Sequence, residues 1–163
     1  MKVRKLACSL FAITLGLVGS AAVHADGDDN DLIRGSMRAC PSDGTVLGGV
    51  NSCGKIWKLA HGSAKLGADG KLQIHIKGLV LDDPSTGPDN GTPDGVNEVL
   101  GTVICGGSGG SVVGQSAAVP MPVTGNVFIR TKLTLPAHCT APVIIVQERI
   151  NGVIGGWLAS TGN

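Results

Sequence analysis

The sequence predicts an all-β domain, an antiparallel β-sandwich of the immunoglobulin-like or Greek-key kind, held together by two disulfides. Three observations predict this fold class. Short apolar runs with period-two alternation recur along the chain, turn-forming residues separate them at close intervals, and no run has a convincing helical period. The 26 glycines are interleaved with β-branched runs, which is typical of turns between strands and not of a collagen-like or disordered chain.

The chain opens with the layout of a secretory signal peptide. Basic residues come first, an apolar run follows and small residues lead to the cleavage position, in the order Lys2, Arg4, Lys5, residues 6–18 and Ala25. Cys8 lies at the start of the apolar run, whereas a lipid-acceptor cysteine follows such a run, so we expect Cys8 to leave with the leader. The leader at 1–25 predicts export to the periplasm or the medium, and residues 26–163 are expected to form one β domain.

The first strands of the mature chain are predicted from alternation. Residues 26–31 are acidic and have no apolar side chain to bury, so this stub is expected to be flexible. The clearest hairpin runs from 63–66 through a turn at 68–70 into 71–77, where Leu and Ile alternate with Lys, Gln and His. We expect the apolar side chains of this hairpin in the core and its polar side chains in water.

Five further strands follow a long loop. The loop at 82–97 is rich in Pro, Gly, Asp and Asn, and loops of this length inside a domain are often functional. The strands after it are expected, in order, at residues 99–105, 111–119, 127–135, 143–146 and 153–154. Pro136 ends the third of these strands, and Asn151-Gly152 favours a type I′ turn between the last two because both positions tolerate positive φ.

Four cysteines remain after the leader, and export allows them to form a disulfide framework. Sequence alone does not choose among the three pairings that are open to Cys40, Cys53, Cys105 and Cys139. We favour Cys40 with Cys53, because this bridge closes a short glycine-rich segment. The remaining pair, Cys105 with Cys139, ties the end of one core strand to the residue just beyond another. In the chain-entropy treatment each closure stabilises the fold by about 3–4 kcal/mol. A zinc site is disfavoured because no Cys-x-x-Cys pair occurs.

Charge and aromatic content argue against several classes of partner. Without the three basic residues of the leader, ten of the thirteen Lys and Arg face twelve acidic residues, a formal charge of −2, which does not favour nucleic acid or anionic lipid. Only Trp57, Phe128 and Trp157 remain as aromatic rings, so a platform that stacks bases or sugars is not expected, and both tryptophans are expected in the core. No second apolar stretch approaches the roughly 20 residues that cross a bilayer.

The acidic loop is the one candidate for a metal site. Its oxygen ligands, Asp82, Asp83, Asp89, Asp94 and Glu98, are enough in number for calcium, which takes six to eight oxygens. Their spacing departs from the EF-hand rule, since a loop with Gly95 at its sixth position has Gly101 instead of glutamate at its twelfth. A solvated, turn-rich loop is therefore the leading interpretation and calcium the alternative; no other cofactor is expected.

No catalytic residue is predicted. The loop 106–110 satisfies G-x-S-x-G around Ser108, but a nucleophile elbow needs a helix directly behind the serine, and the residues that follow are strand-like. His138 and Glu148 occur later in the chain, in the reverse of the order that such hydrolases use. The three mature histidines would form a metal site only if separate strands brought them together.

Two stretches resemble known secreted proteins. Residues 62–79, with a Gly-x-Ala strand that turns at Asp-Gly into an alternating strand ending in Gly-Leu, resemble the opening hairpin of CHRD-type secreted β domains. The histidine pair that follows in that family is absent, and the acidic loop stands in its place, so the resemblance implies no metal role here. An apolar-Cys run at 103–105 and Leu-Pro-x-x-Cys at 135–139 are similar to the last core strands of small exported bacterial β-sandwich proteins, which implies a shared scaffold and no activity.

The sequence thus predicts an exported, non-enzymatic binding or structural protein with a protein or cell-surface partner that the residues do not identify. Three alternatives remain open. The first is a calcium-stabilised adhesion or matrix component, and the second is a secreted hydrolase that uses Ser108. The third is a protease inhibitor that presents the loop between Cys40 and Cys53.

Overall fold

The computed structural model describes residues 30–162. The predicted leader and residues 26–29 of the predicted stub lie outside this range. Within it the chain is all-β apart from one short 3₁₀ helix. In order, the elements are β1 (Asp31–Ala39), β2 (Trp57–Lys58), β3 (His61–Gly67), β4 (Lys71–Lys77), β5 (Val80–Leu81), η1 (Pro84–Asp89), β6 (Glu98–Cys105), β7 (Ser111–Gln115), β8 (Val119–Pro120), β9 (Val127–Lys132), β10 (Val143–Ile150) and β11 (Val153–Thr161).

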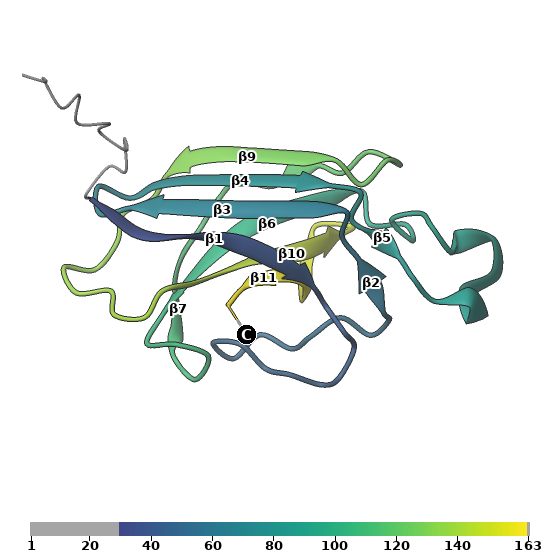
Figure 1. Ribbon diagram of the computed structural model, residues 1–163, viewed down its shortest axis with the longest axis horizontal. Helices are drawn as coiled ribbons and strands as arrows, with labels where there is room; N and C mark the ends of the chain where they lie inside the picture. The colour runs from purple at the N-terminus through teal and green to yellow at the C-terminus, as the bar shows by residue number, and fades with distance from the viewer. Residues whose placement is uncertain (1–29, 163) are drawn as a thin grey trace, which may run out of the picture.

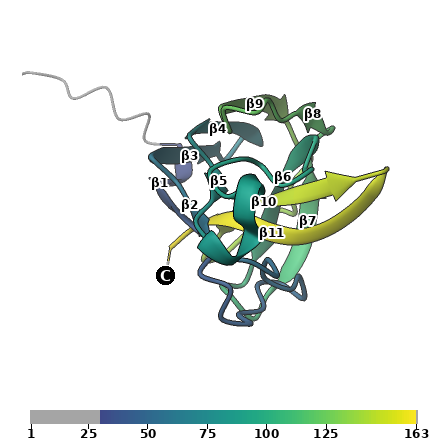
Figure 2. The same cartoon turned by 90° about the vertical axis from the view of Figure 1, so that its right-hand side faces the viewer.

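One curled antiparallel sheet contains nine of these strands. Its order is β7-β6-β10-β11-β1-β3-β4-β9, with β8 also paired to β6, while β2 and β5 form a separate two-stranded ribbon. The first part of β1 pairs with β3 and its last three residues pair with β11, so β1 joins the two halves of the sheet. The part of the sheet made of β1, β3, β4 and β9 curls into a half-barrel (Figures 1 and 2), and the predicted sandwich is not confirmed.

The core lies inside the curl. Leu72, Ile74 and Ile76 of β4 are buried and alternate with polar residues that point outward, as the sequence predicted. They face β6 across the interior, where a side chain on Gly101 would place its Cβ 2.7 Å from Ile74 Cδ1. Glycine at this position allows the two halves of the sheet to pack at close range.

A second apolar layer covers the outer side of β6, β10 and β11. The loop 40–56 lies there, and its Leu47 is fully buried. Its Gly48 lies so close to Ile104 that a Cβ on residue 48 would be 2.7 Å from Ile104 Cγ1. Trp157 is buried beneath this loop, and its indole N–H donates to the Thr45 carbonyl at 3.1 Å. Trp57 is also buried, which confirms that both tryptophans serve the core.

The two favoured disulfides are confirmed. Cys40 is bonded to Cys53 and Cys105 to Cys139. The first bridge closes the loop that carries Leu47. The second ties the end of β6 to the segment that leads into β10, so both act where long connections meet the sheet.

The predicted hairpins are confirmed, with corrections at their ends. The β3–β4 turn uses Gly70 at φ 82°, and the β10–β11 turn has positive φ at both Asn151 and Gly152. The strand expected at 127–135 ends at Lys132, which pairs with Lys71 at the start of β4; past this point only the Leu133 N–H continues the pairing, donating to the carbonyl of the turn residue Gly70 at 2.8 Å. The strand expected at 111–119 breaks into β7 and β8 around Ser116, whose hydroxyl accepts a hydrogen bond from Gly101 N–H at 3.0 Å.

Strand β1 was not predicted. Gly35 in its middle weakens the apolar alternation, although Leu32, Arg34 and Ser36 do point outward. The expectation of a flexible stub is wrong at its last residue, since Asp31 begins β1 and forms ion pairs with Arg34 and Lys65.

Candidate anion-binding site

The outward side chains of β3, β4, β9 and the part of β1 that pairs with β3 (residues 31–36) form a surface that we call the basic face. Cross-strand register places Arg34 beside Lys65, Lys65 beside Gln73, and Gln73 beside Arg130, so these residues form one row across four strands. A neighbouring row pairs Lys71 with Lys132, and Lys77 closes the far end of β4. Six of the ten lysines and arginines between residues 30 and 162 therefore lie on this face: Arg34, Lys65, Lys71, Lys77, Arg130 and Lys132.

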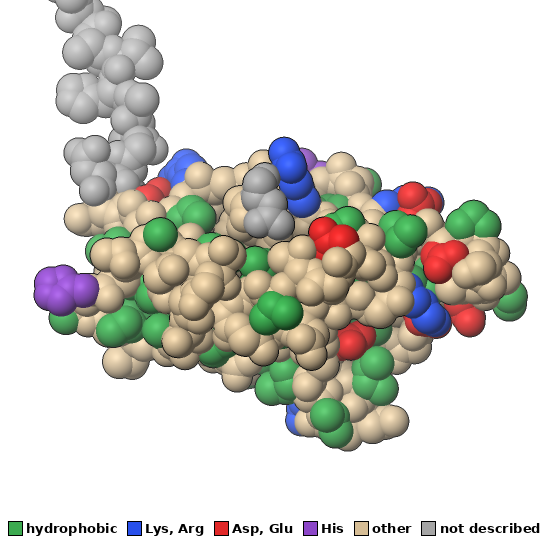
Figure 3. Space-filling view, turned by 90° about the horizontal axis from the view of Figure 1, so that it is seen from below, with side chains coloured by type: hydrophobic (Ala, Val, Ile, Leu, Met, Phe, Trp, Pro, Cys, Tyr) green, Lys and Arg blue, Asp and Glu red, His purple; other side chains and the backbone are tan. Residues whose placement is uncertain are grey.

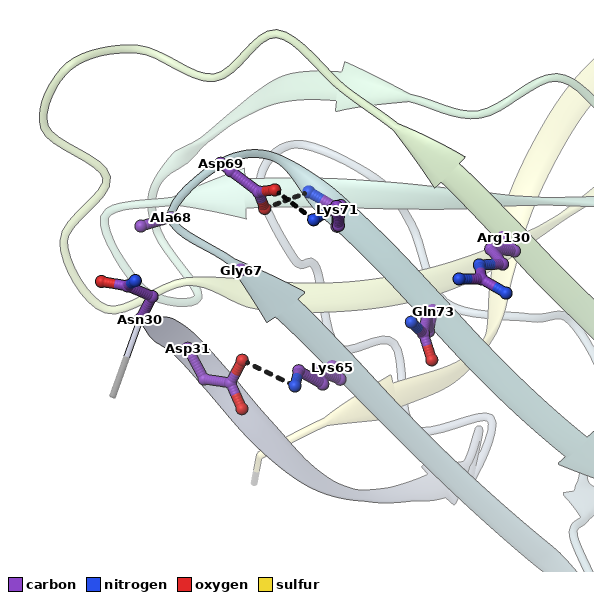
Figure 4. A pocket seen from close by; sticks show the side chains of 9 residues that line it. All are labelled: Asn30, Asp31, Lys65, Gly67, Ala68, Asp69, Lys71, Gln73 and Arg130. Carbon is purple, nitrogen blue, oxygen red and sulfur yellow. Dashed lines mark hydrogen bonds and ion pairs between the residues drawn. The ribbon is translucent and has the colours of Figure 1, made fainter. Parts of the chain in front are cut away.

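The basic face contains a hollow of about 590 Å³, which we call the basic hollow. It is lined by Asn30, Asp31, Lys65, Gly67, Ala68, Asp69, Lys71, Gln73 and Arg130. Gly67 has no side chain to fill the space, and a Cβ there would lie 2.7 Å from Asp69 Oδ1. Figure 4 shows the side chains of Gln73 and Arg130 next to each other at one end of the hollow. Its size falls in the range of roughly 300–1,000 Å³ that is usual for small-molecule sites.

Ion pairs organise one side of the hollow. The two carboxylate oxygens of Asp31 each lie 3.1 Å from a cation, Oδ1 from Lys65 Nζ and Oδ2 from Arg34 Nε. Asp69 Oδ2 lies 2.9 Å from Lys71 Nζ. The hydrogen bonds that the Asp69 carboxylate accepts from the Lys71 side chain and backbone lower the pKa of Asp69, and the charge of Lys132 adds to this effect. Asp69 is therefore ionised at neutral pH, and the ion pairs of Asp31 and Asp69 neutralise part of the local positive charge.

The cations of the face outnumber these carboxylates. Among the residues from 30 to 162, Arg130, Lys132 and Lys77 have no acidic partner within ion-pair distance. The opposite side of the molecule, which carries the loop 40–56, differs: its charged side chains are scattered among uncharged ones (Figure 3). Positive charge is thus concentrated on one face of a protein with little net charge.

The carboxylates predicted for calcium lie near cations: the hydrogen bond from Lys55 to Asp94, and the charges of Asp94, Asp89 and Asp83, raise the pKa of Lys55. Asp82 pairs with Lys58 at 3.0 Å, Asp94 pairs with Lys55, and Glu98 pairs with Arg149 at 2.9 Å. The carboxylate of Asp83 caps η1 by accepting from the Ser85 backbone and hydroxyl, and these hydrogen bonds lower its pKa; Asp89 ends the same helix. In the described part of the chain no three His, Cys, Asp or Glu side chains are grouped so that they could hold a metal ion. A calcium role for this loop remains an untested prediction.

The other candidate residues lie apart from the hollow. Ser108 is in the β6–β7 loop, where its carbonyl accepts from Gly48 N–H at 2.8 Å, and strand β7 follows it in place of the helix of a nucleophile elbow. His75 points outward as predicted and lies against Phe128, with ring centroids 4.3 Å apart. His61 and His138 are exposed. The loop between Cys40 and Cys53 packs onto the sheet through the buried Leu47, and most of its other residues are exposed or half-buried; the inhibitor alternative stays a prediction.

Sequence reasoning missed the basic face. It placed Lys71, Gln73 and His75 on a wet surface and recognised Arg130 and Lys132 in a second alternating strand, but it treated each strand separately. The signal was the repeated Lys, Arg and Gln at alternate positions of both strands. Because the sequence does not show that β4 and β9 are neighbours, these residues could not be predicted to form one site.

Comparison with known proteins adds no assignment. No protein family, no curated protein and no solved structure matches this chain. The resemblance of residues 62–79 to CHRD-type domains therefore stays a prediction. The structure itself defines a class: a disulfide-bonded, antiparallel β domain with a basic hollow on the outer face of its sheet. No helix in the described range is long and apolar enough to cross a membrane.

Proposed function

We propose that this chain is an exported, non-catalytic binding protein and that the basic hollow holds an anionic ligand. The observation that carries the proposal is the placement of six of the ten described lysines and arginines on one sheet face, around a hollow of ligand size. Two disulfides support the export that the leader predicts, because such bonds persist in oxidising compartments.

The side chains around the hollow suit recognition of an anion. Arg130 offers a planar guanidinium that can donate two parallel hydrogen bonds to a carboxylate or sulfate, and Lys71 offers a point charge on the same side of β4. Gln73 lies between Lys65 and Arg130 in the same row, and its amide can donate or accept hydrogen bonds. All three groups are reachable from water, so each contact contributes modestly and affinity depends on several contacts together.

The same lining supports a role without catalysis. None of the residues that line the hollow is a histidine, cysteine or serine, the usual proton carriers and nucleophiles. Its two carboxylates, Asp31 and Asp69, are engaged by cations, and the pKa of Asp69 is lowered, which makes it a weak base at neutral pH.

The test is a titration of the purified, ¹⁵N-labelled protein with galacturonate and with sulfate, followed by backbone amide chemical shifts. We expect shifts centred on residues 65–73 and on Arg130. The double variant Lys71→Ala/Arg130→Ala should weaken binding about tenfold or more, since charged hydrogen bonds are worth about 1.5–3 kcal/mol each and 1.4 kcal/mol is tenfold.

The matched control is Lys58→Ala/Arg149→Ala, which removes the same charge from outside the basic face. It should bind the anions as the unmodified protein does. Equal weakening in both double variants would mean that net charge alone acts, and absence of shifts in the hollow would reject the proposed site.

A further inference from the structure

The basic face continues beyond the hollow to an exposed aromatic ring. Phe128 of β9 is 52% exposed and lies against His75 of β4, with the two rings tilted by 53°. This pair is the next outward row after Gln73 and Arg130 in the register of β4 and β9. An exposed phenyl ring at the first outward position of β9 gains favourable burial only if another molecule covers it, so it favours a bound partner.

The outward residues of β4 and β9 form a track. Successive outward positions on a strand are about 7 Å apart, so the track from Lys71 past Gln73 and His75 to Lys77 is about 20 Å long. Strand β9 adds Lys132, Arg130 and Phe128 alongside. The hollow occupies one end, the ring pair the middle and Lys77 the other end. A ligand that reaches all three must be extended.

The mixture of groups along the track favours a sugar chain over a phosphate chain. Asp31 and Asp69 at the hollow can accept hydrogen bonds from the hydroxyl groups that a sugar unit carries beside its acid group, whereas a polyphosphate chain offers these carboxylates only negative charge. Nucleic-acid grooves that ignore sequence stack successive bases on several rings, whereas the track offers one phenyl ring beside one imidazole. One ring is too few for a stacking platform, but it is enough for a single contact: the apolar face of one sugar unit can cover Phe128 while its hydroxyl groups reach Gln73.

We propose that the basic face binds an extended acidic polysaccharide, laid along β4 and β9, with acidic sugars at the hollow and at Lys77 and a sugar ring on Phe128. This inference rests on the proposed anion-binding function and names its ligand class. The acid groups pair with Arg130, Lys71 and Lys77, and the hydroxyl groups pair with Gln73 and the hollow's carboxylates. The partner is thus a cell-surface or matrix polymer that carries carboxylates.

The experiment compares a disaccharide and an octasaccharide of galacturonic acid by calorimetric titration of the purified protein. We expect the octasaccharide to bind at least about tenfold more tightly, because it gains the ring and Lys77 contacts. Phe128→Ala should weaken octasaccharide binding roughly two- to tenfold and leave disaccharide binding at the hollow unchanged, and Phe128→Tyr should restore it. Val153→Ala, which removes an exposed apolar side chain from the β10–β11 turn, serves as the control and should have no effect.

The outcomes separate the two proposals. Equal affinity for both saccharides, with no effect of Phe128→Ala, would overturn the extended track and leave the hollow as a site for small anions. Tighter binding of a polyphosphate with the same number of charges would overturn the sugar assignment. Failure of every anion to bind, with Arg130→Ala indistinguishable from the unmodified protein, would remove the proposed function as well.

Discussion

Gly101 determines how closely the two halves of the curled sheet can approach, and a substitution there tests this architecture. A Cβ at this position would lie 2.7 Å from Ile74 Cδ1 and 3.2 Å from Leu72 Cδ2, both in β4. Gly101 is not among the glycines with positive φ, so Gly101→Ala acts through this contact and not through backbone strain. Leu72 and Ile74 point inward from β4, and the outward side of β4 carries Lys71 and Gln73 of the proposed site.

The expected cost follows from two opposing effects. Adding a methyl group to a filled core costs about 1–3 kcal/mol. Alanine has less conformational freedom than glycine in the unfolded chain, and this difference stabilises the folded protein by about 0.4–1 kcal/mol. We therefore expect Gly101→Ala to lower the free energy of unfolding by about 1–2 kcal/mol. Ile74→Val alone should cost about 0.5–1.5 kcal/mol, and it deletes the Cδ1 atom that the new Cβ meets.

The double variant distinguishes the contact from a general weakening of the strand. Because Ile74→Val makes room for the alanine, the two costs should not add, and a favourable coupling of about 1 kcal/mol is expected. Urea denaturation of the four proteins measures it, provided that the slope against urea stays constant. Gly35→Ala in β1 is the control, since no heavy atom lies within 4 Å of its Cβ position. Additive costs, or a Gly101→Ala variant as stable as Gly35→Ala, would refute the reasoning.

Three further predictions concern charge, covalent cross-links and metal. Protonation of Asp69, whose pKa is lowered in the folded protein, removes stability as pH falls below the ordinary value of 3.8. The Tm of Asp69→Asn should therefore fall less steeply than that of the unmodified protein over this acidic range, and parallel melting curves would contradict the assignment. Replacing Cys105 and Cys139 together by serine should lower the free energy of unfolding by about 3 kcal/mol in urea; a loss below about 1 kcal/mol would show that the bridge is dispensable. Calcium should leave the Tm unchanged because Asp82 and Asp94 already pair with lysines, whereas a calcium-dependent rise that Asp94→Ala abolishes would restore the calcium alternative.

Local chemistry explains most of what the sequence predicted correctly. The alternation of Leu72, Ile74 and Ile76 with polar residues depends only on the two-residue period of a strand. The Asn151-Gly152 turn depends on two residues that tolerate positive φ, and both adopt it. Strand β1 was missed because Gly35 interrupts its pattern, and the end of β9 was placed too late because the length of its partner could not be known from its own residues.

Sequence alone determined the all-β class, the two hairpins and the buried tryptophans, since these follow from periodicity and from apolar area. The pairing of the cysteines was a preference among three possibilities, and the structure confirmed it. Only the tertiary structure decided that β1 joins both halves of one curled sheet and that β4 lies between β3 and β9. That neighbourhood sets Gln73 beside Arg130 and Lys71 beside Lys132, and so gathers cations from four separate strands onto one face. The physical reason is that strand order and register minimise the free energy of the whole core, whereas each strand's own sequence records only which of its sides is apolar.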